Sequence, residues 1–416
     1  MEKVDLNKNP GAVIVSNSAY DLNALGAVRG LGIKGVRVTW MTPDRSRWFY
    51  SKYCQPIICP DFKRQENRFI EFLVELGKKR KSVRDVLIPT SDASLIIISK
   101  NRTLLEKYFR PMVCDWETTE KFIDKSKTYR IAKSVGVPIP KTFYPQDENE
   151  ARRTAYEIKY PCLVKPALSH IFTPRFKRKL FRVNTPSQLV KTYQSLASKG
   201  FNMMIQEDIP GEDENLITLN TVLNEHSEPL TVFMHRRTRQ NPPRYGVVSL
   251  GESVWEPRII QPCMKLLKAI GFQGIAHVEF KRDPRTGDFK FLEVNGRSYL
   301  SISLPTACGV NLIHIAYRNA IGERIAPLTN YSCTYECGVK WLDFPSYIES
   351  MVKLRWIKNV SLGEWIRPLL SKKITLGAFS RNDPAPFLME LNFLIKNLRG
   401  IVHSISDKSL LHQGVL

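Results

Sequence analysis

Two glutamates on neighbouring predicted strands carry the strongest chemical signal in the sequence. Residues 276–297 read as two strands around a polar turn, which predicts an antiparallel hairpin. If Asp283 pairs with Phe289, Glu279 lies directly opposite Glu293. Two facing carboxylates repel each other unless a positive charge lies between them, so this register predicts a bound cation.

Asn295 and Arg297 share a face with Glu293, because side chains alternate along a strand. Carboxylate and amide oxygens are hard ligands that suit Mg²⁺, and this ion commonly bridges the phosphates of ATP. Arg297 would then hold negative charge that develops on a phosphate or a carboxylate. A solvent-exposed face of Glu, Asn and Arg is the plainer interpretation, and on the spacing alone it is the more common one.

The rest of the chain favours the metal site, because the sequence resembles the ATP-grasp superfamily. Members of that superfamily end their nucleotide-binding lobe with Glu on one strand and Glu-x-Asn-x-Arg on the next. The resemblance rests on four motifs, which are Asp124-Lys125 with Gly136-Val137-Pro138, Tyr160 to Pro166, Gln206 to Gly211, and Glu279 with residues 293–297. Their order across roughly residues 115–322 makes the combination specific, although each motif alone is weak.

The resemblance implies a role for each matching residue. In it, Lys125 and Lys165 bind the ATP phosphates, and the nucleoside is bound by Glu207, Asp208, Ile209 and Glu214. Two Mg²⁺ ions, which Mn²⁺ could replace, are bound by Glu279, Glu293 and Asn295. The resemblance assigns catalysis to Arg297 and, less firmly, to Arg236 and Arg239. The two latter residues belong to a basic cluster, residues 236–244, that follows a predicted strand at 230–235. For a single lysine such as Lys125, a solvated surface position is the alternative.

The branch of the superfamily that the sequence most resembles includes peptidoglycan D-aspartate ligases and carbamoyl-phosphate-synthase-like proteins. The resemblance therefore implies an ATP-dependent carboxylate–amine ligase that forms an amide through an acyl phosphate and releases ADP. Small-molecule carboxylates and amines are the implied substrates, with an amino acid or a cell-surface polymer precursor as candidates. The alternatives from other classes are a basic nucleic-acid-binding protein and an ATP-binding regulator without turnover.

One segment departs from the superfamily pattern. Many ATP-grasp enzymes follow the second lysine with a glycine-rich lid, but residues 166–182 contain no glycine and no acid. They carry five basic residues, which are Arg175, Lys177, Arg178, Lys179 and Arg182. A basic lid that clamps phosphates with side chains is the favoured interpretation. Contact with an acidic acceptor and a solvated loop are the alternatives.

Four units are predicted to position these residues. Alternating strands and helices, with strands at 12–15, 36–40 and 86–89, predict a Rossmann-like parallel sheet over residues 1–114. Mixed strands and helices then predict a two-lobed ATP-grasp fold, with lobe A at 115–205 and the metal-binding lobe B at 206–326. The polar groups at residues 16–18 and 90–92 follow strands of the first unit, where they either help to bind the carboxylate or reflect ordinary loop polarity.

The last unit, residues 327–416, is predicted to be a helical and basic extension beyond the superfamily core. An apolar stripe at helical spacing runs through Phe387, Leu391, Leu394, Leu398 and Ile401. Such a stripe more often docks on its own domain than on an anionic membrane surface.

The global composition bounds the remaining questions. The net charge of +22 and the pI near 9.6 attract polyanions, but no nucleic-acid-binding motif is present, so no specific nucleic acid is predicted as a partner. Contact with an anionic polymer or a membrane surface stays open, and the oligomeric state is not predicted. Eight cysteines without a C-x-x-C pair, of which the closest two, Cys333 and Cys337, are interpreted as isolated thiols, indicate a reducing cytoplasm and no structural metal. No run is apolar enough for a transmembrane helix or a signal peptide, which predicts a cytoplasmic protein, with peripheral membrane contact as an option.

Overall fold

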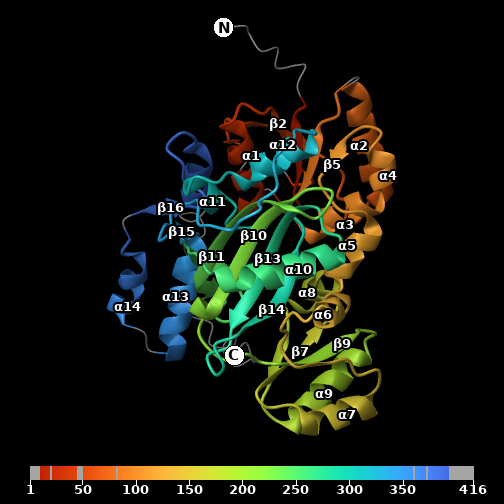
Figure 1. The fold of residues 1–416 in the computed structure, drawn as a ribbon, viewed down its shortest axis with the longest axis vertical. Coiled ribbons are helices and arrows are strands. Elements are labelled where there is room, and N and C mark those ends of the chain that lie inside the picture. The colour runs from red at the N-terminus through yellow and green to blue at the C-terminus, as the bar shows by residue number, and fades with distance from the viewer. Residues whose placement is uncertain are drawn as a thin grey trace.

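Three β-sheets form the described part of the chain, which in this computed structural model comprises residues 10–18, 21–44, 50–80, 83–358, 361–371 and 373–392. Figure 1 shows the first sheet at the top of the molecule, the largest sheet in the middle and the third sheet at the bottom. In this part of the chain no helix is both long and apolar enough to cross a membrane.

The N-terminal sheet is parallel, as predicted, with strand order β3-β2-β1-β4-β5. Its strands are β1 (Ala12–Val15), β2 (Val38–Thr42), β3 (Cys54–Ile58), β4 (Val86–Pro89) and β5 (Arg110–Pro111), and the helices between them are α1 (Leu22–Gly32), α2 (Glu66–Lys79), α3 (Asp92–Lys100) and α4 (Arg102–Leu105). The central strands β1 and β4 are buried throughout, because helices cover both faces of a parallel sheet. The predicted Rossmann-like fold is thus confirmed.

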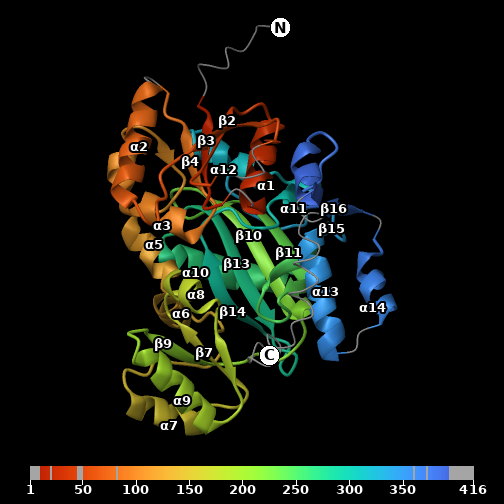
Figure 2. The ribbon, with the colours of Figure 1, turned by 180° about the vertical axis from the view of Figure 1, so that it is seen from behind.

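The third sheet is a small antiparallel one with strand order β6-β9-β7-β8. Its elements are β6 (Thr142–Phe143), α7 (Glu148–Glu157), β7 (Cys162–Pro166), α8 (Ser169–Phe176), β8 (Phe181–Val183), α9 (Pro186–Ala197) and β9 (Met203–Glu207). Helices α7 and α9 pack on one face of it, at the bottom of Figures 1 and 2.

The largest sheet has seven strands in the order β14-β13-β10-β11-β12-β15-β16, and every pair except β15–β16 is antiparallel. The strands are β10 (Leu216–Leu223), β11 (Pro229–Asn241), β12 (Val247–Ser253), β13 (Gly274–Arg282), β14 (Phe289–Asn295), β15 (Lys340–Leu342) and β16 (Ile374–Leu376). The helices around it are α5 (Trp116–Ile123), α6 (Lys125–Ser134), α10 (Ile260–Ile270), α11 (Ser303–Ala307), α12 (Leu312–Ala320), α13 (Phe344–Lys358) and α14 (Leu362–Ile366). Parallel and antiparallel sheets with an ATP-grasp arrangement confirm the predicted fold class.

The C-terminal extension is not purely helical. Its strands β15 and β16 continue the seven-stranded sheet beyond β12, and helix α13 packs beside β11 and β12. Figure 1 shows this blue region alongside the sheet. Of the predicted apolar stripe, residues Leu394, Leu398 and Ile401 lie outside the described residues.

Two cysteines of this region lie close together in space. The eight thiols are free, but the sulfur atoms of Cys333 and Cys337 lie 3.5 Å apart, both in exposed residues. Both thiols are free, as predicted, and the buried Tyr335 lies between them in the sequence.

Candidate active site

A cleft between the small antiparallel sheet and the seven-stranded sheet collects most of the predicted site residues. It is lined from β7, β9, β11, β13 and β14, and from the start of α6. The predicted residues that line it are Lys125, Lys165, Glu207, Asp208, Ile209, Glu279 and Glu293. Segments more than 160 residues apart in the sequence therefore meet at one site.

The two glutamates face each other as predicted, but by a different register. Arg282, not Asp283, lies opposite Phe289, and an irregularity next to Glu279 then shifts the pairing by one residue. Glu279 consequently lies opposite Glu293. A β-bulge adds one residue to one strand, which is why the facing pair survives the wrong starting register.

A cation neutralises each of these carboxylates. The Arg237 guanidinium forms an ion pair with Glu279, and both side chains are about nine-tenths buried. The Lys125 ammonium forms an ion pair with Glu293. Burial opposes ionisation of Glu293, but Lys125 and Lys179 outweigh it and hold the pKa of this carboxyl well below its usual range. Both glutamates are thus available as anionic ligands.

The first phosphate lysine begins a helix. Asp124 caps α6 by accepting hydrogen bonds from the backbone N–H groups of Ser126 and Lys127 at 2.8 and 3.3 Å. The cap fixes the first turn, so that the Lys125 side chain points at Glu293. Burial lowers the pKa of Lys125, but the nearby Glu293 charge dominates and raises it.

The second lysine, Lys165, projects from β7 without an acidic partner among those described. Its Nζ lies 2.8 Å from the Tyr129 hydroxyl and over the face of the Tyr129 ring. Partial burial, together with the positive charge of Lys125, lowers the pKa of Lys165 to about 7. Two ammonium groups with one carboxylate between them create an excess of positive charge, which a polyanion would relieve.

Most of the residues predicted to bind the nucleoside form a hinge at the end of β9. Glu207 accepts a hydrogen bond from the Lys290 ammonium at 3.1 Å, and Asp208 accepts from the Arg182 Nε and the Tyr245 hydroxyl, each at 2.9 Å. Apolar side chains line the cleft beside these groups, at Leu163, Ile209, Leu216 and Leu292. An apolar slot edged by backbone groups is the kind of surface that holds an adenine ring.

Not every predicted residue reaches this cleft. Glu214 pairs with Arg239 at 3.3 Å between carboxylate and guanidinium, and neither lines the cleft. Arg236 pairs with Glu252 at 2.9 Å, also away from it. The structure brings Arg237 to the cleft in their place, because the basic cluster is part of the long strand β11 and does not follow it.

Asn295 and Arg297 lie beside the cleft, towards the N-terminal sheet. The Asn295 amide donates to Glu293 at 3.3 Å, and Arg297 Nε lies 2.6 Å from an Asp92 oxygen. Asp92 is the first residue of α3, at the end of β4, so Arg297 connects the hairpin to the polar strand ends of the first unit. There the Ser91 hydroxyl donates to Asn17 at 2.9 Å.

The glycine-free segment folds into α8 and β8. Phe172 is fully buried and packs against Phe176, Phe181 and Phe201, so the segment has an aromatic anchor. Of its five basic residues, only Lys179 lines the cleft. Three of the others have partners: Arg175 and Arg178 lie over phenylalanine rings, and Arg182 pairs with Asp208, which itself lines the cleft.

Several cleft residues were not predicted as site residues, among them Arg237, Gln240, Tyr245 and Lys281. The Lys281 ammonium donates to the Ile209 carbonyl oxygen at 2.7 Å and so fixes the hinge. A signal for Lys281 was present, because it is two residues from Glu279 on one strand and therefore shares its face. The sequence offered no comparable signal for Tyr245, which lies in a loop.

The donor set suits magnesium. No group of three or more His, Cys, Asp or Glu side chains placed to hold a metal occurs within the described ranges, so the protein offers Glu279, Glu293 and the Asn295 amide. Mg²⁺ is usually held by one or two carboxylates together with substrate phosphates, and it keeps several waters. Two opposed carboxylates beside Lys125 and Lys165 match this requirement.

Comparison with known proteins agrees with the geometry. Residues 254–328, which include the hairpin, match the family "Carbamoyl-phosphate synthase L chain, ATP binding domain". The chain is 26% identical to the D-aspartate ligase of Enterococcus faecium over 316 residues, which cover 72% of this chain and 74% of the relative.

Two solved structures show the same fold. The biotin carboxylase of Campylobacter jejuni in its βγ-ATP complex has a TM-score of 0.61 at 19% identity, covering 79% of this chain and 74% of its own. The L-amino acid ligase of Bacillus licheniformis has a TM-score of 0.58 at 16% identity, covering 77% and 78%. With the predicted motifs brought to one cleft, these findings agree with the ATP-grasp resemblance: the chain is similar to ATP-grasp enzymes in sequence and in fold.

Proposed function

We propose that this ligase uses the cleft to activate the carboxylate of an amino acid or a cell-surface polymer precursor, and joins it to an amine. The observation that carries the proposal is the convergence of Lys125, Lys165, Lys179 and Arg237 on the facing pair Glu279 and Glu293. Cations alone suit any anion, but cations interleaved with two metal-binding carboxylates suit a nucleoside triphosphate with its metal.

The reaction takes place in two transfers. A substrate carboxylate oxygen attacks the γ-phosphorus of ATP, the bond to the β-phosphate oxygen breaks, and ADP leaves. The amine then attacks the acyl carbon, the amide forms, and phosphate leaves with the proton lost by the amine. The lysines hold the phosphate oxygens in line and neutralise their charge, which is the main demand of phosphoryl transfer.

Magnesium, bound by Glu279, Glu293 and Asn295, would supply further charge neutralisation on the phosphates. The number of ions and the use of Mn²⁺ belong to the proposal as well. Glu207, Asp208 and Ile209 hold the nucleoside in it. Of the residues outside the cleft, Arg297 has the best-supported role, since it lies between the hairpin and the strand ends of the N-terminal sheet.

We place the binding site for the carboxylate substrate at those strand ends. The Thr90 hydroxyl lies 2.6 Å from Asp21, and the Ser91 hydroxyl 2.9 Å from Asn17, so polar groups from β1 and β4 gather near Arg297. A carboxylate substrate bound there would meet the Arg297 guanidinium, which can bind it through two hydrogen bonds. Asp208 and Glu214 have no part in this subsite.

An ADP-release screen tests the proposal directly. Purified protein with ATP and Mg²⁺ is offered pairs of amino acids and cell-wall precursors, and products are identified by mass. We expect turnover with at least one pair, and none with Glu293→Gln. If no pair gives ADP above the rate of that variant, while ATP still raises the melting temperature, the protein binds nucleotide without ligating.

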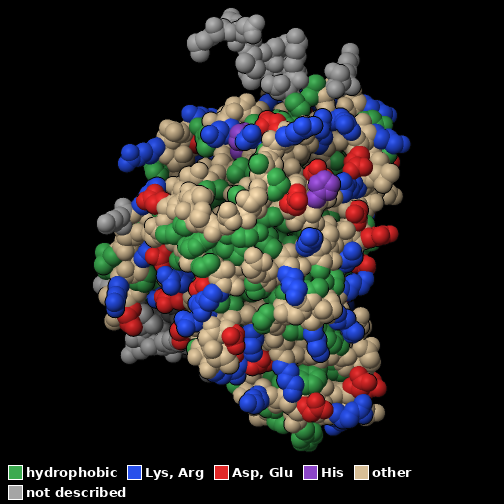
Figure 3. Space-filling view, in the orientation of Figure 1, with side chains coloured by type: hydrophobic (Ala, Val, Ile, Leu, Met, Phe, Trp, Pro, Cys, Tyr) green, Lys and Arg blue, Asp and Glu red, His purple; other side chains and the backbone are tan. Residues whose placement is uncertain are grey.

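A cytoplasmic location and contact with an anionic polymer or membrane surface stay part of the proposal. On the face shown in Figure 3, Lys and Arg side chains are spread widely, with Asp and Glu side chains among them. This distribution supports weak attraction to anionic surfaces better than a specific nucleic-acid interface.

A further inference from the structure

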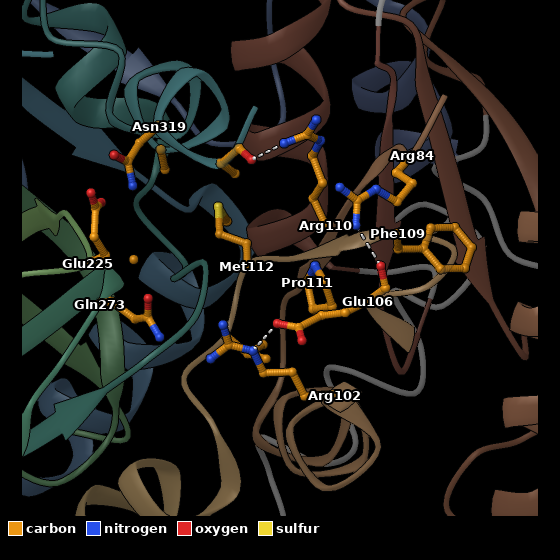
Figure 4. Close-up of a pocket in the computed structure, with 14 residues that line it drawn as sticks. Arg84, Arg102, Glu106, Phe109, Arg110, Pro111, Met112, Glu225, Gln273 and Asn319 are labelled. Carbon is orange, nitrogen blue, oxygen red and sulfur yellow. Dashed lines mark hydrogen bonds and ion pairs between the residues drawn. The ribbon is translucent and has the colours of Figure 1, made fainter. Parts of the chain in front are cut away.

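A second cavity lies apart from the active-site cleft and shares no lining residue with it. Its volume is about 350 Å³, within the range of small-molecule sites. It lies where the N-terminal parallel sheet meets the seven-stranded sheet. Figure 4 shows Arg84, Arg102 and Arg110 on one side, and Glu225, Gln273 and Asn319 on the other.

The arginine side of this cavity carries positive charge that the protein does not fully neutralise. Arg102 Nε pairs with Glu106 at 2.6 Å, which accounts for one guanidinium. Arg84 Nη1 donates at 2.8 Å to the Glu106 backbone oxygen, and Arg110 Nη1 reaches the Ala320 backbone oxygen at 3.4 Å. Both of these backbone partners are neutral carbonyl groups. The guanidinium groups of Arg84 and Arg110 are therefore hydrogen-bonded, but these bonds do not neutralise their positive charge.

Arg110 also has an unused donor. Its Nε is buried and has no hydrogen-bond partner among the described residues. A buried N–H without an acceptor costs free energy, and a guanidinium costs more than a neutral group. An oxyanion in the cavity would supply the missing negative charge, and a shift of the Arg110 side chain towards it would give this enclosed N–H an acceptor.

We propose that this cavity binds a small molecule through a carboxylate or phosphate group, held by Arg110 and Arg84. The facing wall favours uncharged or donor groups at the other end of the ligand, because Glu225 would repel a second anion there. The site is independent of the proposed ligase reaction. Because its walls come from both sheets, the ligand contacts two units of the fold at once.

Calorimetric titration of the full chain with inorganic phosphate and, separately, with 4-hydroxybutyrate, a monocarboxylate with an uncharged donor at its other end, at constant ionic strength tests this site. We expect Arg110→Gln to weaken binding roughly tenfold, the typical effect of losing one charge-assisted hydrogen bond. Glu225→Gln should tighten it, because a repelling charge is removed. Arg84→Gln, at an exposed residue that does not threaten folding, should weaken it as well.

Two further variants separate this site from other anion binding. Arg64→Gln changes an arginine whose side chain is 86% exposed, and it should leave the titrations unchanged. Lys165→Met alters only the active-site cleft, and the response should survive it. Binding of phosphate alone would identify a phosphate ligand and binding of 4-hydroxybutyrate alone a carboxylate, and either supports the site. Equal affinities in wild type, Arg110→Gln and Arg84→Gln would overturn it, as would a response lost only in Lys165→Met.

Discussion

At the scale of single residues, the facing glutamates make the sharpest prediction. Glu293→Gln removes a negative charge from a side chain that is about one-third exposed, so the fold should tolerate the change. Turnover should fall by roughly a hundredfold or more, because a charged metal ligand is lost where phosphoryl charge must be stabilised. ADP release measures the effect, with the exposed Glu75→Gln on α2 as the control. Near-normal turnover would remove the hairpin from the metal site.

Adjacent arginines on β11 provide a matched pair of variants. Arg237→Gln leaves Glu279 without its buried ion pair and should lower kcat by roughly tenfold or more. Arg236→Gln changes a side chain that is 40% exposed and should keep activity within about twofold. Arg237→Lys, which keeps the charge, should recover part of the loss and so distinguishes chemistry from folding. The reverse ranking of the two glutamine variants would restore Arg236 as the catalytic residue.

Lys165 predicts proton uptake when ATP binds. Its pKa near 7 in the free protein means that the side chain is mostly the neutral amine at pH 8. Bound phosphates favour the charged ammonium form. Titration calorimetry at pH 8 in buffers of different ionisation enthalpy should show uptake, which should fade at pH 6. Lys165→Met should abolish it, whereas the exposed Lys191→Met should not. Uptake that is unchanged in Lys165→Met would assign the proton to another group.

The lowered pKa of Lys165 also makes the stability of the free protein depend on pH. In the unfolded chain Lys165 keeps its ordinary pKa, so between about pH 7 and 10 the unfolded state binds more protons than the folded state. The penalty for burying this charge is therefore fully present below pH 7 and is relieved as the pH rises. Within this pH range, tight ATP binding is favoured at the low end, and high stability of the protein without ATP is favoured at the high end.

The residues that sequence reasoning placed well are those fixed by local spacing. Glu279, Glu293, Lys125 and Lys165 meet because strand alternation and a helix cap determine their directions. Their roles in catalysis stay predictions. The arginines of β11 could not be ranked, because the irregular pairing between Arg237 and Gln240 changes which side chains face the cleft. Backbone irregularities of this kind depend on the partner strand and leave no clear sequence pattern.

At the scale of elements, the glycine-free segment sets the access to the cleft. The cleft has a volume of only about 140 Å³, below the range usual for ligand sites, because cations and carboxylates converge in it. Nucleotide entry must therefore part some of these groups. Lys179 comes from the turn between α8 and β8, which makes this turn the element best placed to move.

Two substitutions in this segment should behave differently. Lys179→Ala should raise the apparent KM for ATP several-fold, since one charge-assisted contact is lost. Arg175→Ala, which lies over the Phe201 ring, should not change it. Limited trypsin digestion should cut the segment in the free protein and spare it with ATP and Mg²⁺. Equal effects of both substitutions, or equal digestion with and without ATP, would mean that the segment is no lid.

Elements with regular periodicity were predicted well, and elements held by distant partners were not. Strands β1 and β4 lie where they were predicted, at residues 12–15 and 86–89. Strand β3 was missed, because its side chains are largely exposed and Pro56 interrupts the pattern expected of a strand. Helices α3 and α4 are separated at Asn101, a break that the alternation of strands and helices does not reveal.

At the scale of the whole molecule, the C-terminal region is tied to the N-terminal sheet. Strands β15 and β16 each have three residues and exist because β12 offers an edge, which local sequence cannot reveal. Beyond them, Asp383 is 2% exposed and lies against α1, with its carboxylate 2.9 Å from the Arg29 Nε. It also accepts from the Ser51 hydroxyl at 2.8 Å and the Lys52 backbone N–H at 3.0 Å.

This buried ion pair predicts that the two ends of the fold unfold together. Asp383→Ala leaves the Arg29 charge buried, which typically costs about 3–5 kcal/mol in the free energy of unfolding. A double-mutant cycle with Arg29→Ala measures the coupling by urea denaturation. The exposed pair Lys127–Glu120, with a similar 2.6 Å separation, is the control and should contribute about 0–1 kcal/mol. If Asp383→Ala costs no more than the control, the C-terminal region is a dispensable addition. If the cost is as predicted and a single transition is retained, residues 327–392 stabilise the sheet that holds Asp92 and Arg297 in register, and the extension is then part of the enzyme's core.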